Sequence, residues 1–226
     1  MFTIYSADVT GNPSNCSYPH KHVVLDEASL KAAVCHDYVC AEYQNSYRNG
    51  DNFIGSDCLP VDCDNDHTED SAGWKTPEDV MEAFPGVTFA IHYSRFNMRE
   101  KNGKPARPKF HVLFPIDYIT DAALYSDMKK LVNSIFPYFD TKALDAARFF
   151  FGTKEPEVEI FDGPMTLTTF LADDDFDANM DSGSYGDIVI PEGSRNATLS
   201  HYAGRILKRF GNTDEAHKHF AEVAAC

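Results

Sequence analysis

The chain has 226 residues, 43% of them hydrophobic, which is enough for one sizeable core with or without a small appendage. No apolar run approaches the roughly 18 residues that a membrane span needs, and the first residues lack a signal-peptide pattern. We therefore expect a cytoplasmic protein with no membrane partner. The net charge of −15 argues against tight binding to bare duplex DNA, because contacts to phosphates dominate that affinity.

The six cysteines have no compact pairing pattern, so we expect reduced thiols. Two pairs, Cys35 with Cys40 and Cys58 with Cys63, are each separated by four residues, which is the upper end of the spacing for paired zinc ligands. The strand pattern turns Cys63 toward the core. We therefore favour reduced thiols over a zinc site.

The first predicted elements are a strand at residues 20–25 and a helix at residues 27–40, where apolar side chains recur at helical spacing. A turn with the sequence Asn-Gly-Asp-Asn follows at residues 49–52. The next apolar run, residues 59–63, predicts a strand that leads into a strongly acidic block. This part of the sequence thus predicts strands and helices in mixed order.

Asp62 and Asp64 close the run at residues 59–67 as two carboxylates two residues apart. Successive side chains of a strand point to opposite faces, so these two project together while Val61 and Cys63 turn to the other side. Carboxylates held this close repel each other unless a cation lies between them, and such oxygen ligands suit Mg²⁺ or Mn²⁺. The alternative is that one aspartate caps the following turn and the other is solvated.

The middle of the chain continues the mixture of elements. Thr76 and Pro77 predict the start of a helix that ends before Pro85. Strands are expected at residues 87–93, 109–114, 149–151 and 158–161, a basic loop at 97–108, and an amphipathic helix at 122–136. Strands and helices do not alternate as they do in a doubly wound sheet, so we expect an α+β domain with a mixed or antiparallel sheet.

Six basic residues and one acid, Glu100, lie between Arg95 and Lys109, beside the acidic block. On the following strand, Lys109 shares one face with His111, and the apolar side chains share the other. Together with Arg107, these two residues would suit an incoming triphosphate. A lone histidine on a strand is otherwise commonly solvated or hydrogen-bonded.

Asp140 follows an aromatic run after the expected helix, and Arg148 precedes three consecutive phenylalanines. Taken alone, Asp140 could cap a turn as readily as bind a metal ion. The single tryptophan, Trp74, is expected as a packing anchor, with base stacking as the alternative.

The C-terminal part has a different composition. Residues 173–187 are acidic and poor in apolar residues, which predicts a linker. Residues 188–226 predict a small helical module, either packed on the main domain or the start of a longer module. The domain expected before the linker is residues 1–172.

In this order the pieces resemble the archaeo-eukaryotic primase superfamily: an Asp-x-Asp at a strand end, a strand histidine, then an aspartate after an apolar residue. The similarity is greatest to primase-polymerases of phages, plasmids and other mobile elements, and it spans residues 55–226. Residues 190–196 resemble the start of the helical module that follows such enzymes. The alternative is that this stretch is only a turn and a helix N-cap. The resemblance implies an RRM-like catalytic core followed by a C-terminal helical segment.

The resemblance also implies roles for individual residues. Metal binding would fall to Asp62, Asp64 and Asp140, with Asp140 preferred over Asp145 because an apolar residue precedes it and an arginine follows about eight positions later. His111 would contact the phosphates of the incoming nucleotide. The other nucleotide-binding candidates are Ser94, Arg95, Arg107, Lys109, Arg148 and Lys154. Many relatives carry serine where this chain has Lys109, which leaves a substitute phosphate ligand or a solvated charge as its role.

The function that the resemblance implies is a template-dependent nucleotidyltransferase, a DNA primase and polymerase in the replication of a phage or mobile element. It would synthesise or extend primers on single-stranded DNA from NTP or dNTP substrates with two Mg²⁺ or Mn²⁺ ions, in the cytoplasm of a bacterial host. A replicative helicase would be a partner, on the same parent chain or separate. Two rivals stay open: a non-catalytic replication initiator that binds DNA, and a metal-dependent phosphodiesterase.

Overall fold

The computed structural model describes residues 1–101, 103–171, 217–218 and 221. The expected linker at residues 173–187, and all of the expected C-terminal module except residues 217–218 and 221, lie outside the described residues. No helix of the described part is both long and apolar enough to cross a membrane.

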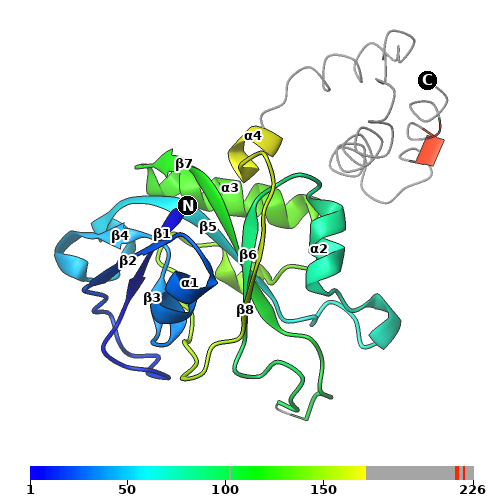
Figure 1. Cartoon of the computed structure of the whole chain (residues 1–226), viewed down its shortest axis with the longest axis horizontal. Coiled ribbons are helices and arrows are strands. Elements are labelled where there is room, and N and C mark those ends of the chain that lie inside the picture. Colours follow the sequence, from blue (N-terminus) through cyan, green and yellow to red (C-terminus); the bar gives the residue numbers. More distant parts are fainter. Residues whose placement is uncertain (102, 172–216, 219–220, 222–226) are drawn as a thin grey trace, which may run out of the picture.

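The described part of the chain contains two antiparallel sheets (Figure 1). The larger sheet has five strands in the order β4 (Glu42–Tyr43), β5 (Phe53–Cys63), β7 (Phe110–Ile119), β6 (Phe89–Tyr93) and β8 (Val158–Phe161). The smaller sheet has three strands in the order β2 (His20–Val24), β1 (Phe2–Ser6) and β3 (Tyr38–Val39). The neighbouring strands of both sheets pair antiparallel. The expected α+β class is therefore confirmed, whereas the RRM-like description stays a prediction.

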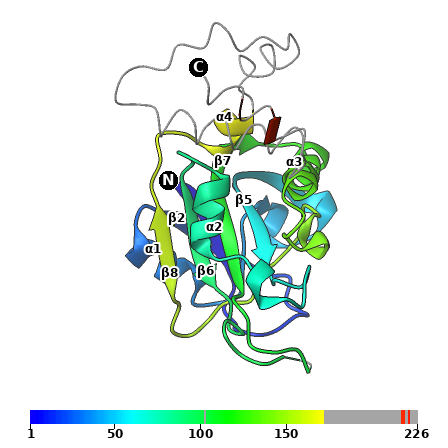
Figure 2. The same ribbon diagram turned by 90° about the vertical axis from the view of Figure 1, so that its right-hand side faces the viewer.

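Within residues 1–171, four α-helices are divided between the two faces of the larger sheet. Three of them contribute to one core and lie on one face: α2 (Pro77–Ala83), α3 (Ala122–Ile135) and α4 (Leu167–Leu171) (Figure 2). The fourth, α1 (Glu27–Val34), packs on the other face together with the smaller sheet. Local sequence explains where they begin: Asp26 and Thr76 form capping boxes, and Asp121 accepts hydrogen bonds from two backbone N–H groups.

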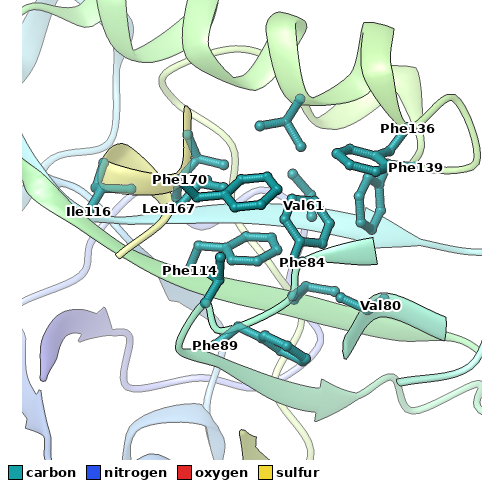
Figure 3. Close-up of a cluster of buried hydrophobic side chains, with 14 of the residues drawn as sticks. Val61, Val80, Phe84, Phe89, Phe114, Ile116, Phe136, Phe139, Leu167 and Phe170 are labelled. Carbon is teal, nitrogen blue, oxygen red and sulfur yellow. The ribbon is translucent and has the colours of Figure 1, made fainter. Parts of the chain in front are cut away.

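The core under α2, α3 and α4 is rich in aromatic side chains (Figure 3). Phe84 lies at its centre, with ring centroids 4.4 Å from Phe136, 4.7 Å from Phe114 and 5.7 Å from Phe170. The opposite face carries a second core, in which Cys58, Ala90 and Leu113 of the large sheet meet α1 and the small sheet. The large sheet is therefore covered on both faces, and successive side chains of its strands point into one core and then the other.

Three sequence-based predictions need correction. The helix expected at 27–40 ends at Val34, because the next residues form β3, which pairs with β1. The strand expected at 149–151 is reduced to one bridge between Phe150 and Tyr38. The carboxylate strand is longer than expected, since β5 begins at Phe53, and its last strand residue is Cys63.

Candidate metal centre

Strand alternation separates the carboxylates from the helical core. Val61 and Cys63 are buried in the core beneath the helices, whereas Asp62 between them faces the side of the small sheet. In the sheet register Asp62 lies opposite His111 of β7, and His111 lies opposite His92 of β6. Three neighbouring strands thus present polar side chains at one place on this face.

Asp140 completes an acidic triad with Asp62 and Asp64. Each of the three offers a ligand oxygen, and these oxygens all lie within 4.8 Å of one another. The Asp140 backbone N–H donates to the Asp62 carbonyl oxygen at 2.7 Å, which ties the segment after α3 to the end of β5. Asp145, the alternative, lies outside this group: it is exposed, and its carboxylate accepts from the Ala147 N–H at 2.8 Å.

Burial disfavours the ionised form of the Asp62 carboxyl group. Only 7% of the residue is exposed, and burial, together with the charge on Asp64, raises the pKa of Asp62 to about 7. Arg148 and Lys109 act in the opposite direction, and Asp140 raises the pKa further. A cation between the three carboxylates would remove this penalty, and an all-oxygen donor set of this kind fits Mg²⁺ or Mn²⁺.

Two cationic side chains already contact the triad. Lys109 Nζ lies 2.9 Å from Asp64 Oδ1 and donates to the Asp64 carbonyl oxygen at 2.9 Å. Its side chain is only 4% exposed, so Lys109 is not a solvated charge. Arg148 approaches Asp62 from the segment before Phe150, with its terminal nitrogen 3.7 Å from Asp62 Oδ2.

Arg107 is fully buried, and it does not line the pocket beside the triad. Its guanidinium donates to the Asn65 carbonyl oxygen at 2.8 Å and to Glu69 Oε2 at 2.9 Å, and it lies 5.0 Å from the Trp74 ring centre. Arg107 therefore anchors the acidic loop that follows Asp64. Lys104 pairs with the same loop through Asp66 at 3.1 Å, so part of the basic segment neutralises the acidic block.

A pocket of about 310 Å³ opens beside the triad. It is lined by acidic, basic and aromatic side chains: Pro13, Asp62, Asp64, Ser94, Arg95, Phe96, Lys101, His111, Arg148, Phe149, Phe150 and Phe151. Arg95 lies over Phe151, with its guanidinium carbon 3.9 Å from the ring centre. This pocket combines carboxylates, cations and aromatic faces, which are the groups that bind metal ions, phosphates and bases.

A second pocket, of about 540 Å³, adjoins the first and shares Ser94 and Arg95 with it. Arg99, Lys154 and Glu157 are among the residues that line it. The sequence-predicted site residues thus fall into several groups. Asp62, Asp64, His111 and Arg148 line the first pocket, Ser94 and Arg95 line both pockets, and Lys154 lines the second. Asp140 lines neither pocket but belongs to the triad, while Lys109 and Arg107 contact the acidic segment.

The imidazole of His111 faces the triad. Its Nε2 lies 3.8 Å from Asp62 Oδ1, and burial lowers its pKa to about 3, so the ring is neutral at neutral pH. The Asp64 carboxylate opposes this shift and Arg148 reinforces it. A neutral imidazole can offer a hydrogen-bond donor here without adding a positive charge beside bound metal ions.

Sequence reasoning missed three residues that hold His111 and the pocket wall. Tyr38 reaches His111 from β3, but the sequence placed it inside a helix. His92 lies within a correctly predicted strand, where its alternation with apolar neighbours is the only signal. Asp37, fully buried, accepts from the backbone N–H groups of Gly11 and Gly152 at 2.8 and 3.0 Å. It thereby joins two segments that flank the pocket.

A comparison with solved structures finds similarity to the AEP domain of the primase-polymerase (PrimPol, fragment PP-N190) of cyanophage S-2L. The similarity covers 72% of this chain and 81% of that one, with 14% sequence identity and a TM-score of 0.41. No protein-family model matches the chain, and no curated protein sequence matches it.

Proposed function

We propose that this chain is a metal-dependent nucleotidyltransferase of the primase-polymerase type, acting on single-stranded DNA with nucleoside triphosphates. The observation that carries the proposal is the acidic triad: Asp62 and Asp64 at the end of β5 and Asp140 after α3 place carboxylate oxygens within 4.8 Å of one another. They line or adjoin a pocket that also holds Arg95, Arg148 and His111. Carboxylates beside cations are the combination that a triphosphate with its divalent ions requires.

The three carboxylates would hold two Mg²⁺ or Mn²⁺ ions, which supply charge neutralisation for the attacking 3′-hydroxyl and the departing pyrophosphate. Asp62, Asp64 and Asp140 then act as ligands. Burial of Asp62 favours a site that closes around a cation, because the charged carboxylate is costly without one. Two divalent ions balance the charge of a triphosphate, and the cationic side chains around the pocket offset the charge of the carboxylates.

The other pocket residues would bind and orient the substrate. Arg148, Arg95 and Ser94 lie where they can bind phosphate oxygens, and His111 donates from its imidazole. Lys109 and Arg107 have a supporting role, since Lys109 orients Asp64 and Arg107 holds the loop after it. Lys154, in the second pocket, is proposed to contact the primer or template strand.

The wider proposal includes an RRM-like catalytic core at residues 1–172, followed by an acidic linker and a helical module. It places the protein in the replication of a phage or another mobile element, with a replicative helicase as a partner. Primer, template and NTP or dNTP would meet at the pocket beside the triad. The order of motifs along the sequence supports this part of the proposal.

One gel experiment tests the proposal. Full-length protein is incubated with single-stranded template, labelled nucleotides and Mn²⁺ or Mg²⁺, with and without a primer, beside the double variant Asp62→Ala, Asp64→Ala. We expect metal-dependent products from the wild type, and at least a 1000-fold loss in the variant with its circular dichroism spectrum unchanged. Equal extension by wild type and variant would contradict the proposal.

The same gel separates the rival functions. A replication initiator would bind the template without synthesis, which a mobility shift in the absence of nucleotides reveals. A phosphodiesterase would shorten the labelled template when metal is present and nucleotides are absent. The intact triad favours an enzyme over the initiator, and the basic pocket wall favours a triphosphate substrate over hydrolysis of a DNA strand.

A further inference from the structure

A continuous line of hydrogen-bonding groups runs behind the pocket, through strands β3, β6 and β7. The Tyr38 hydroxyl lies 3.0 Å from Nδ1 of His92 and 3.0 Å from Nδ1 of His111. On the far side, His92 Nε2 lies 3.2 Å from the Thr153 hydroxyl. Tyr38 and His92 are fully buried, and His111 is 6% exposed. Such buried polar groups need hydrogen-bond partners, because each one left unpaired lowers the stability of the folded state.

Counting protons makes the two histidines unequal. The Tyr38 hydroxyl has a single proton, so it can donate to only one of the two Nδ1 atoms. The other Nδ1 must carry a proton and donate it to the Tyr38 oxygen. All three side chains are buried, and burial disfavours a charged ring, so both imidazoles carry one proton and Tyr38 keeps its hydroxyl proton. One ring is therefore the Nδ1–H tautomer and the other is the Nε2–H tautomer.

The surroundings of His111 decide which ring is which. Its Nε2 faces Asp62 Oδ1 at 3.8 Å, and it opens onto the pocket. An ionised carboxylate, the form that a metal ligand takes, can only accept, and so can a phosphate oxygen. A proton on His111 Nε2 therefore meets acceptors, whereas a bare Nε2 would face like-charged lone pairs. At the other end, Thr153 can donate its hydroxyl proton to His92 Nε2.

We propose that Tyr38, His92 and Thr153 are positioning residues that hold His111 as the Nε2–H tautomer, so that it donates to an anionic oxygen of the bound substrate. The direction of donation is then Thr153 to His92, His92 to Tyr38, Tyr38 to His111, and His111 to the substrate. The identity of that substrate as a nucleoside triphosphate rests on the proposed function.

Packing supports the same arrangement. Phe150 stacks on Tyr38 with ring centroids 5.5 Å apart and covers His111 at 4.7 Å, which leaves both rings little freedom to turn. The His92 and His111 rings meet edge to face at 5.3 Å. A neutral donor at His111 also avoids the repulsion that an imidazolium would feel from two divalent cations on the adjacent carboxylates.

Nitrogen NMR tests the tautomers directly. Long-range ¹H–¹⁵N spectra of the ¹⁵N-labelled full chain distinguish a protonated from a bare ring nitrogen. The signals lost in His92→Gln and in His111→Gln identify the two rings. We expect a protonated Nε2 on His111 and a protonated Nδ1 on His92. Thr153→Ser should keep this pattern, whereas Thr153→Val should mix the tautomers. A protonated Nδ1 on His111, or one shared tautomer, would overturn the proposal.

Tyr38→Phe tests the consequence for binding, because it removes only the hydroxyl. We expect its Kd for dATP with Mg²⁺ to rise about 5–10-fold, the effect of one lost hydrogen bond, while its affinity for Mn²⁺ alone is unchanged. Tyr125→Phe is the matched control: Tyr125 is equally buried and donates its hydroxyl to the Cys58 carbonyl oxygen at 2.7 Å, within the opposite core.

The two proposals fail separately. An unchanged dATP affinity in folded Tyr38→Phe protein would contradict the positioning role. Wild-type protein that shows the expected tautomers but has no affinity for dATP would support the hydrogen-bonded line and contradict the proposed function. A loss of dATP affinity of similar size in Tyr125→Phe would show that general destabilisation explains the result for Tyr38→Phe. The positioning role would then be contradicted.

Discussion

Successive residues of strands β5 and β7 alternate between two faces, and these faces differ in the side chains that they carry. On the helical face, Val61, Val112 and Phe114 are buried among other apolar side chains from α2, α3 and α4. On the opposite face, near the same end of the strands, Asp62 and His111 are buried beside charged and hydrogen-bonding partners. The first face is apolar and stabilises the fold, whereas the second adds the candidate chemistry at one end of its own apolar core.

This difference shows where each face finds its partners. An apolar side chain accepts any neighbour of suitable volume, because dispersion and the hydrophobic effect are not directional. A buried carboxylate or imidazole needs a particular atom at a particular distance. On the polar face those atoms come from Tyr38, Asp140 and Arg148, which lie in three separate stretches of the chain.

The largest expected effect lies on the apolar face. Phe114→Ala leaves a cavity between Phe84 and Phe89, whose ring centroids lie 4.7 and 5.7 Å from that of Phe114. We expect a loss of about 3–5 kcal/mol in the free energy of unfolding, measured by urea denaturation. Metal affinity below the midpoint should be retained, because the triad lies on the other face. A loss of metal affinity in the folded variant would show that the faces are coupled.

Asp140→Ala compared with Asp145→Ala tests the polar face. The first removes a member of the triad, and we expect nucleotide incorporation to fall at least about 100-fold, or roughly 3 kcal/mol in transition-state stabilisation. The second changes an exposed aspartate five residues along the chain and should retain incorporation within about threefold. Steady-state extension of a labelled primer measures both. The reverse order of effects would move the third ligand to Asp145.

The third prediction concerns the stability cost of burying Asp62 without metal, and it depends on pH. Its folded pKa of about 7 lies above the unfolded value of about 3.9, so the folded state binds the extra proton between these two values. The stability that this proton provides is present below pH 4 and is lost as the pH rises toward 7. Asp62→Asn has no such loss, so its Tm advantage over the wild type in EDTA should grow across this window and then level off. A shift of about 3 pKa units corresponds to about 4 kcal/mol, or a Tm difference of roughly 10 °C.

Thermal scans between pH 4 and 8 measure this difference, and adding Mn²⁺ supplies the control. The metal should raise the Tm of the wild type at pH 7 and above by favouring the ionised triad, and it should raise that of Asp62→Asn much less. A Tm difference that stays constant with pH would mean that Asp62 is ionised throughout, with Arg148 and Lys109 compensating its burial.

Local patterns determined much of the larger sheet. Alternation along residues 59–63 and 109–114 separated the apolar side chains from Asp62 and His111, as the structure has them. The capping residue Thr76 and Pro77 located the start of α2. These predictions depend on periods of two and 3.6 residues and on side chains that bond to their own backbone a few positions away, so neighbouring residues contain the whole signal.

Only the tertiary structure decided which polar groups meet. Residues after Val34 look helical, but pairing with β1 draws Tyr38 into a strand, from which its hydroxyl reaches His111 across 73 positions of sequence. The sequence predicted both Arg107 and Lys109 as phosphate ligands. In the structure both are buried, and each binds the acidic segment that follows β5. By itself the sequence determined the face on which each side chain lies. The partner that each side chain finds depends on sheet register and long-range packing, which no local period encodes.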